Sequence, residues 1–187
     1  MNLKFLASSS LTATALVSTL LLTACAGMDA PSATAQLQPT KGSTTSGTVN
    51  FVQSGDKVMI SLDIKGLKPN AEHGFHVHDK GDCSSGDGMS AGGHFNPLSA
   101  AHGGHHTTTH HVGDLPSLET NASGIARFYF ESTSIAVGTG DSNIVGRSLI
   151  VHRDPDDFTT QPTGNAGPRL ACAVISLPQS RSTSSSY

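Results

Sequence analysis

The sequence predicts an all-β fold, an antiparallel sandwich or barrel built from short strands. Of its 187 residues only 13% are charged, 20 are glycines and none is tryptophan. This composition, with its many Thr, Ser and Val positions, argues against a helical bundle or a coiled coil. No apolar period of 3.6 residues extends over a useful length, whereas several short stretches alternate apolar with polar residues. Many short strands without a strong helix are typical of antiparallel architectures.

Six stretches of the chain are expected to form strands. Residues 48–53 and 57–65 come first, and a Ser-Gly-Asp turn joins them. The apolar residues of the second stretch share one parity and mark a buried face; they are Val58, Ile60, Leu62 and Ile64. The other expected strands are residues 72–79, 125–131, 147–152 and 170–177. Without a register the sequence does not sort Phe128 and Phe130 into core or surface.

Residues 1–24 have the layout of a secretory signal peptide. Lys4 is the only charge before an apolar stretch that ends in Leu-Leu-Thr-Ala-Cys. Interruptions by Ser and Thr make this stretch too polar for a good permanent membrane span. The ending resembles a bacterial lipoprotein box, in which Cys25 is lipidated and becomes the first mature residue; the alternative is an ordinary secretory signal with a bystander cysteine. Because Ala26 follows the cysteine rather than an aspartate, we expect a periplasmic protein anchored in the outer membrane.

One domain is expected over residues 47–180. The preceding residues 25–46 contain almost no large apolar side chain, so we expect a lipidated, flexible tether there, and a flexible tail over residues 181–187. A domain of this length is an ordinary single folding unit. The chain has 11 basic and 14 acidic residues, a formal net charge of -3, so no basic surface for nucleic acid is evident and we expect no nucleic-acid partner.

The first metal-binding pattern is Gly-Phe-His-Val-His over residues 74–78. Residues two apart on a strand point to the same face, so His76 and His78 can converge on one ion. Phe75 then points into the core. His73 has the parity of Phe75, and we expect an inward histidine that is satisfied by hydrogen bonds. A His-x-His pair by itself is weak evidence, because it also occurs by chance.

Further candidate ligands follow in glycine-rich loops and at the end of a later strand. They are His94, His102, His111, Asp114 and His152. The glycines beside them let the backbone turn sharply, which helps separated side chains to converge. Imidazoles with one carboxylate suit copper and zinc, whereas calcium and magnesium prefer oxygen ligands. The sequence therefore predicts a site for copper or zinc.

These motifs resemble those of the copper/zinc superoxide dismutase family, in its bacterial periplasmic form. The resemblance covers residues 47–176 and includes two separate signatures, residues 74–78 and the run Gly-Asn-Ala-Gly-Pro-Arg-Leu-Ala-Cys at 164–172. It implies an eight-stranded antiparallel Greek-key barrel with long metal-binding loops. It also implies dismutation of superoxide to O₂ and H₂O₂ by redox cycling of one copper beside one structural zinc, an activity that would protect the cell envelope.

The resemblance also assigns roles to individual residues. The implied copper ligands are His76, His78, His94 and His152. The implied zinc ligands are His94, His102, His111 and Asp114, with the His94 imidazolate bridging the metals and supplying a proton to the departing peroxide. Asp156 would hydrogen-bond ligands of both metals, with Asp154 and Asp157 as rivals for that role. Arg169 stands in the family's anion-guiding position, and Cys83 and Cys172 match its disulfide.

The zinc loop departs from the family pattern. No Lys or Arg lies between Phe95 and Gly113, and three further histidines stand there, His105, His106 and His110. They are either solvent-exposed polar residues, or they supply a positive field when protonated or collect scarce metal. His110 could also compete with His111 for zinc, although the spacing to Asp114 favours His111.

A non-catalytic periplasmic copper/zinc-binding protein on the same barrel is the alternative function. Relatives of that kind usually lose a copper ligand or the arginine, and here all of these residues are present. The sequence leaves open whether the protein is a monomer or a homodimer.

Overall fold

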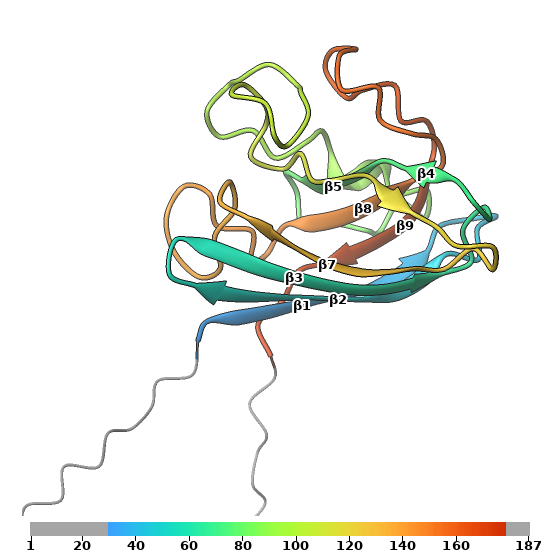
Figure 1. Cartoon of the computed structure of the whole chain (residues 1–187), viewed down its shortest axis with the longest axis horizontal. Helices are drawn as coiled ribbons and strands as arrows, with labels where there is room; N and C mark the ends of the chain where they lie inside the picture. The colour runs from blue at the N-terminus through green and yellow to red at the C-terminus, as the bar shows by residue number, and fades with distance from the viewer. Residues whose placement is uncertain (1–29, 179–187) are drawn as a thin grey trace, which may run out of the picture.

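Residues 30–178, which the computed structural model describes, form antiparallel strands and long loops (Figure 1). The strands are β1 (Ser32–Pro39), β2 (Ser46–Ser54), β3 (Lys57–Lys65), β4 (Glu72–His73), β5 (Phe75–His78), β6 (Leu118–Glu119), β7 (Ala126–Ser132), β8 (Ser148–His152) and β9 (Arg169–Val174). Within this range the only helix is η1 (Met89–Ala91), a single 3-10 turn, and no helix is long and apolar enough to cross a membrane. The predicted all-β fold class is confirmed.

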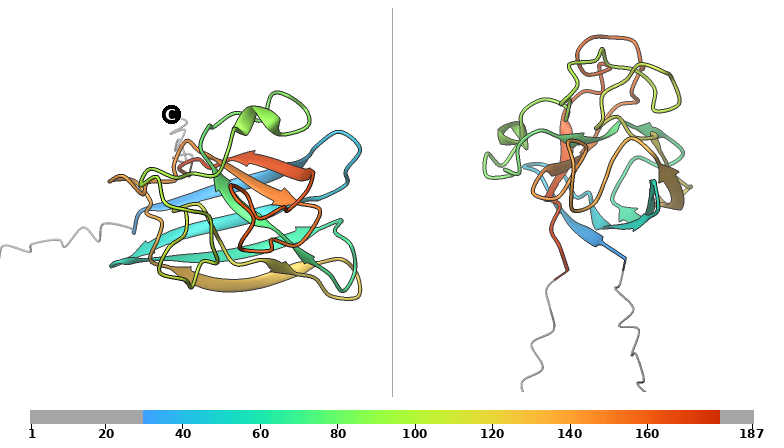
Figure 2. Two further views of the ribbon diagram at one scale, coloured as in Figure 1. Left: turned by 90° about the horizontal axis from the view of Figure 1, so that it is seen from above. Right: turned by 90° about the vertical axis from the view of Figure 1, so that its left-hand side faces the viewer.

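Seven strands form one curled sheet in the order β5-β8-β9-β1-β2-β3-β7, with every neighbouring pair antiparallel (Figure 2). The curl brings the two ends of the sheet around a common interior, as in a Greek-key barrel. A second, two-stranded sheet consists of β4 and β6.

The strand expected over residues 72–79 is broken at Gly74. Its first part, β4, pairs with β6, and its second part, β5, pairs with β8. At the break the Gly74 N–H donates to the carbonyl of Asp154, and the His152 N–H donates to the carbonyl of Gly74. The chain thus changes partners at this residue. Taken together as one bent segment, β4 and β5 reduce the nine strands described within residues 30–178 to the eight that the resemblance implies.

The expectation of a flexible tether over residues 25–46 is wrong for residues 32–39, which form β1. This strand lies inside the sheet between β2 and β9, and its inward side chains, Ala33, Ala35 and Leu37, are buried. Two of these three are too small to signal a core strand by composition. Hydrogen bonds to partners on both sides satisfy the backbone, so the strand orders with little apolar side-chain area.

The core lies inside the curled sheet. The parity predicted for β3 is confirmed, since Val58, Ile60, Leu62 and Ile64 are all buried. On the neighbouring β7, Phe128 and Phe130 are half-buried and pack against this core, whereas Tyr129 between them is 75% exposed. The register of β7 against β3 therefore places both phenylalanines on the core side.

Two long loops gather on one side of the sheet, above β5 and β8 (Figure 1). One covers residues 79–117 between β5 and β6, and the other covers residues 153–168 between β8 and β9. A disulfide between Cys83 and Cys172 joins the first loop to β9, as the resemblance implies. The expected signal peptide, the lipid-bearing Cys25 and the expected tail over residues 181–187 lie outside the described residues.

Candidate metal centre

Strand β5 is the base on which the candidate site is assembled. One edge of β5 pairs with β8, which ends at His152. At its other edge the Val77 N–H donates to the carbonyl of Gly113, and the Phe95 N–H donates to the carbonyl of Val77. A side chain at position 113 would overlap the Val77 carbonyl, so this close approach requires glycine. This pairing places the candidate ligands of the first long loop beside the two histidines of β5.

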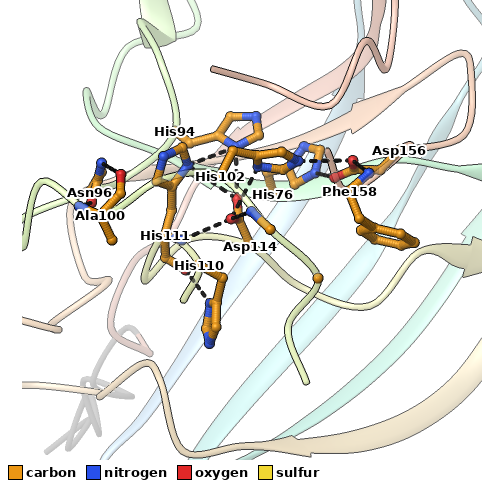
Figure 3. Close-up of polar contacts among 12 residues, drawn as sticks. His76, His94, Asn96, Ala100, His102, His110, His111, Asp114, Asp156 and Phe158 are labelled. Atoms are coloured by element: carbon orange, nitrogen blue, oxygen red, sulfur yellow. Dashed lines mark hydrogen bonds and ion pairs between the residues drawn. The ribbon is translucent and has the colours of Figure 1, made fainter. Parts of the chain in front are cut away.

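The seven candidate ligands form two buried clusters of four that share His94. Figure 3 shows five of these ligands, with Asp156 beside them: His76, His94, His102, His111 and Asp114. The four-histidine cluster consists of His76, His78, His94 and His152. The aspartate cluster consists of His94, His102, His111 and Asp114. In each cluster every residue offers a ligand atom within 4.8 Å of the others. The structure thus brings together every metal ligand that the resemblance implies.

In the four-histidine cluster, partners outside the cluster fix the orientation of the rings. The Nδ1–H of His78 donates to the carbonyl of Gly92 at 2.9 Å, and the Nδ1–H of His152 donates to the carbonyl of Gly167 at 3.1 Å. A carbonyl only accepts, so these rings carry their proton on Nδ1 and present the Nε2 lone pair. The two Nε2 atoms lie 3.4 Å apart.

The remaining nitrogens of this cluster are buried without a hydrogen-bond partner. They are Nδ1 of His76 and Nε2 of His94. A buried polar atom without a partner is costly and rare in folded proteins. With the Nε2 atoms of His78 and His152, these nitrogens form a set of four imidazole donors, which suits copper. The residues therefore fit a bound copper ion.

The aspartate cluster is organised around the carboxylate of Asp114. Its oxygens lie 2.8 Å from Nδ1 of His94, 3.1 Å from Nδ1 of His102 and 3.4 Å from Nδ1 of His111. The backbone N–H of His111 donates to the same carboxylate at 2.8 Å and helps to orient it. Three imidazoles with one carboxylate match the ligand types and the number that zinc requires. This cluster therefore fits a bound zinc ion.

Asp156 is the carboxylate that joins the two clusters. Its oxygens lie 2.6 Å from Nε2 of His76 and 2.9 Å from Nε2 of His102. The rival Asp154 instead pairs with Arg153, and the rival Asp157 accepts hydrogen bonds from Thr159 and Thr160. The structure thus places Asp156, and neither rival, in contact with residues of both clusters.

Burial and neighbouring carboxylates set the protonation of these groups before any metal binds. Burial lowers the pKa of His78 and of His152 well below the ordinary value, and it is the main cause that lowers the pKa of His94 to about 4. Burial also opposes a charge on His102, but its contacts with Asp114 and Asp156 outweigh burial and raise its pKa to about 9. Three imidazoles of the four-histidine cluster are therefore neutral at pH 7, as metal ligands must be.

Arg169 is held beside the four-histidine cluster by two backbone carbonyls. Its Nη1 donates to the carbonyl of Gly88 and its Nη2 to the carbonyl of Gly92, each at 2.6 Å. The Gly92 carbonyl also accepts from His78, so one backbone atom positions both the arginine and a candidate ligand. Burial lowers the pKa of Arg169, but a guanidinium stays charged in proteins. A fixed positive charge thus stands next to the cluster.

Comparison with protein families decides the relationship. The family model described as "Copper/zinc superoxide dismutase (SODC)" matches residues 45–175, which contain both clusters, Arg169 and the disulfide. The chain belongs to the copper/zinc superoxide dismutase family. Members of this family bind copper and zinc, and the chain is accordingly an oxidoreductase that dismutates superoxide.

Curated members of the family align over most of the chain. A "Superoxide dismutase [Cu-Zn]" of Paramecium bursaria Chlorella virus 1 is 47% identical over 135 residues, which are 69% of this chain and 71% of the viral protein. The Saccharomyces cerevisiae protein of the same name is 41% identical, over 71% of this chain and 90% of its own. "Superoxide dismutase [Cu-Zn] 2" of Aquifex aeolicus is 38% identical, over 69% of this chain and 78% of its own.

Some contacts of the centre were not predicted from the sequence. The carbonyl of Gly92 is the clearest case, because every residue offers a carbonyl; the only sequence signal is that glycine tolerates the φ of 76° found there. His73 is buried as expected, but only its Nδ1–H has a partner, the carbonyl of His152, while its Nε2 has none. His110 stays out of the aspartate cluster (Figure 3), so His111 holds the ligand position.

Proposed function

We propose that the two clusters carry out superoxide dismutation with copper in the four-histidine cluster and zinc in the aspartate cluster, and that the chain does so in a bacterial cell envelope. The observation that carries the assignment is that each cluster holds four buried ligand atoms within 4.8 Å of one another, with Nδ1 of His76 and Nε2 of His94 left without a hydrogen-bond partner. The proposal holds for a monomer as well as for a homodimer, because one chain supplies every residue of both clusters.

The chemistry requires a redox ion, a proton and control of an anion. Bound copper supplies the one-electron oxidation of one superoxide and the one-electron reduction of a second, whereas zinc has no redox chemistry. Two superoxide anions and two protons give one O₂ and one H₂O₂. His94 is the residue placed to handle a proton, because its Nε2 faces the four-histidine cluster while its Nδ1 faces Asp114.

Arg169 would attract superoxide and orient it at the cluster. Its guanidinium is anchored to the carbonyls of Gly88 and Gly92 and stands close enough to His78 and His152 to lower their pKa further. The same field favours an anion at that place. The first long loop has no lysine or arginine between Phe95 and Gly113. Arg169 therefore contributes a larger share of the attraction for the anion than it would if other basic residues surrounded it.

The decisive experiment is to load the purified protein with copper and zinc and to follow superoxide decay by pulse radiolysis. We expect the loaded parent to accelerate decay, His76→Ala to lose the activity, and Arg169→Ala to slow it by about tenfold or more, with a weaker dependence on salt. Arg153→Ala removes the same charge from an exposed arginine that is paired with Asp154, and it should change little.

The same samples separate the proposal from its alternative. If the loaded parent binds both metals but superoxide decays no faster in its presence than with His76→Ala, the chain is a non-catalytic copper/zinc-binding protein. If Arg153→Ala slows the reaction as much as Arg169→Ala, the specific role of Arg169 is wrong.

The envelope assignment rests on the N-terminal sequence and on the disulfide. The signal-like residues 1–24, followed by Cys25, favour export and lipidation, and a disulfide such as that between Cys83 and Cys172 persists in oxidising compartments. We expect the chain, expressed in a bacterium and labelled with a fatty acid, to carry the label in the outer-membrane fraction. Cys25→Ser should lose the label and the membrane association; a labelled Cys25→Ser protein would overturn lipidation at this residue.

A further inference from the structure

Two histidines outside both clusters stand together at a corner of the first long loop. The N–H of Thr107 donates to the carbonyl of Gly104 at 2.8 Å, which closes a β-turn with His105 and His106 as its central residues. The hydroxyl of Thr107 donates to the same carbonyl at 2.7 Å and reinforces the turn. His106 is exposed and His105 is half-buried. The loop thus presents an adjacent pair of imidazoles in a fixed local conformation.

The spacing of the pair is that of two ligands on one metal ion. Nε2 of His105 and Nδ1 of His106 are 3.4 Å apart. Two nitrogens bound to zinc at about 2.0–2.1 Å in a tetrahedral arrangement lie about 3.3–3.4 Å from each other. The same separation of 3.4 Å occurs between Nε2 of His78 and Nε2 of His152 in the four-histidine cluster. The pair therefore repeats the nitrogen separation found within a cluster that fits a metal. Its rings stand edge to face with centroids 4.4 Å apart, against 5.5 Å for His78 and His152, so the exposed His106 ring must rotate to aim both lone pairs at one ion.

A hydrogen bond does not account for this geometry well. The separation of 3.4 Å exceeds the usual range for protein hydrogen bonds. His105 also leaves its other nitrogen, Nδ1, buried without a partner. Burial, with the neighbouring His106 and His110, lowers the pKa of His105, so its ring is neutral at pH 7 and has a lone pair to offer.

The third additional histidine of the loop, His110, has a different role. Its Nδ1–H donates to the carbonyl of His111 at 2.6 Å, and its Nε2 lies 3.3 Å from the hydroxyl of Ser134. Its Nδ1 is therefore firmly engaged within the fold, and its Nε2 makes a longer contact there. His110 links the loop to the segment that follows β7, and it serves as a matched control for the pair.

We propose that His105 and His106 form a third metal site, which binds Zn²⁺ or a similar late first-row ion through Nε2 of His105 and Nδ1 of His106. No third ligand accompanies the pair among the described residues, so water completes the coordination. The site lacks a carboxylate and lies partly in solvent, so it binds more weakly than the buried clusters and exchanges its ion first. The inference goes beyond superoxide dismutation and does not depend on it.

The test is the metal content of the full chain, purified without an affinity tag and already holding one copper and one zinc. The protein is dialysed against Zn²⁺, and elemental analysis then gives the metal bound per chain. We expect the parent and His110→Gln to retain one additional zinc, and the double variant His105→Gln/His106→Gln to retain none. Imidazole NMR signals of His105 and His106 should shift on addition of Zn²⁺ in the parent.

Two results would overturn the third site: a parent that takes up no additional zinc, or a double variant that takes up as much as the parent. Superoxide decay measured on the same samples keeps this outcome separate from the catalytic assignment. The double variant should retain both original metals and the parental rate, since neither substituted residue belongs to either cluster. A double variant that loses one of the original metals would show that the pair supports the loop instead, and would also overturn the proposal.

Discussion

At the scale of single residues, the centre depends on histidines that use both ring nitrogens. In His76, His78, His102 and His152 one nitrogen faces a cluster and the other is held by a carbonyl or a carboxylate, which fixes the orientation of the ring. His78 and His152 are held by neutral backbone carbonyls, whereas His76 and His102 share the carboxylate of Asp156. Besides the shared residue His94, Asp156 is therefore the side chain that connects the two clusters.

Asp156→Asn should weaken metal binding in both clusters without removing a ligand. The carboxylate accepts from Nε2 of both His76 and His102, whereas an amide offers one acceptor oxygen and turns N–H groups toward the other ring. Loss of such a partner typically lowers metal affinity by about 10–100-fold. Competition with a chelator, followed by elemental analysis, measures the change for copper and zinc separately.

Asp154→Asn is the matched control for this substitution. Asp154 pairs with the exposed Arg153 and contacts neither cluster through its side chain, so its loss should leave both affinities unchanged. Equal effects of the two substitutions would mean that general loop disorder, rather than the hydrogen bonds of Asp156, determines metal retention.

At the scale of elements, the sequence predicted those strands whose own side chains alternate clearly between apolar and polar. In β3 four branched apolar residues alternate with polar ones, and this strand was expected with its observed bounds. The strand β1 was missed because Ala33 and Ala35 carry little apolar area, and its order comes from β2 and from β9, more than a hundred residues away. The ligand positions followed from family motifs, but the role of the Gly92 carbonyl could not be predicted, because every residue type offers a backbone carbonyl.

Leu37→Ala tests whether β1 belongs to the folded core. Leu37 is 1% exposed, and truncation of a buried leucine costs about 2–5 kcal/mol in the free energy of unfolding. Gln38→Ala, at the neighbouring exposed position, should change it by less than about 0.5 kcal/mol. Urea unfolding of the metal-loaded proteins gives both values. A Leu37→Ala protein as stable as the parent would mean that the segment is a tether after all.

The disulfide should affect both stability and Arg169. It closes a separation of 89 residues, for which the loop-entropy estimate is about 4 kcal/mol. It also fixes the loop whose Gly88 and Gly92 carbonyls hold the guanidinium. The double variant Cys83→Ser/Cys172→Ser should therefore unfold at a lower urea concentration and should dismutate superoxide more slowly. Lower stability with an unchanged rate in the folded protein would separate the two effects and contradict the positioning role.

At the scale of the whole molecule, the curled sheet and the metal centre contribute differently to stability. The sheet has a continuous apolar core, whereas the two long loops meet above β5 and β8 around buried imidazoles and carboxylates (Figure 1). Nδ1 of His76 and Nε2 of His94 are buried with no hydrogen-bond partner. Metal binds the folded protein and not the open chain, so removing it should lower the unfolding free energy.

The metal-free protein should also have a characteristic dependence on pH. The histidines of the four-histidine cluster have pKa values lowered chiefly by burial; they are His76, His78, His94 and His152. In the unfolded chain their pKa is about 6.5, so below that pH the unfolded chain takes up protons that the folded chain does not. Their contribution to the unfolding free energy is therefore present above about pH 6.5 and is lost as the pH falls, by up to about 1.4 kcal/mol per pH unit for each group.

His102 acts in the opposite direction. Its pKa is raised to about 9 by Asp114 and Asp156 despite burial, so its stabilisation is complete below about pH 6.5 and is lost as the pH rises toward about 9. Several groups thus act on the acid side of neutrality and one on the alkaline side.

Urea unfolding of the protein from which a chelator has removed the metals should show the greatest stability near pH 6.5–7, with a steep loss toward acid and a shallow loss toward alkaline pH. The metal-loaded protein should vary less over the same range, because ligated imidazoles take up no protons until the metal leaves. An acid limb equally steep with and without metal would place the titrating groups outside the two clusters.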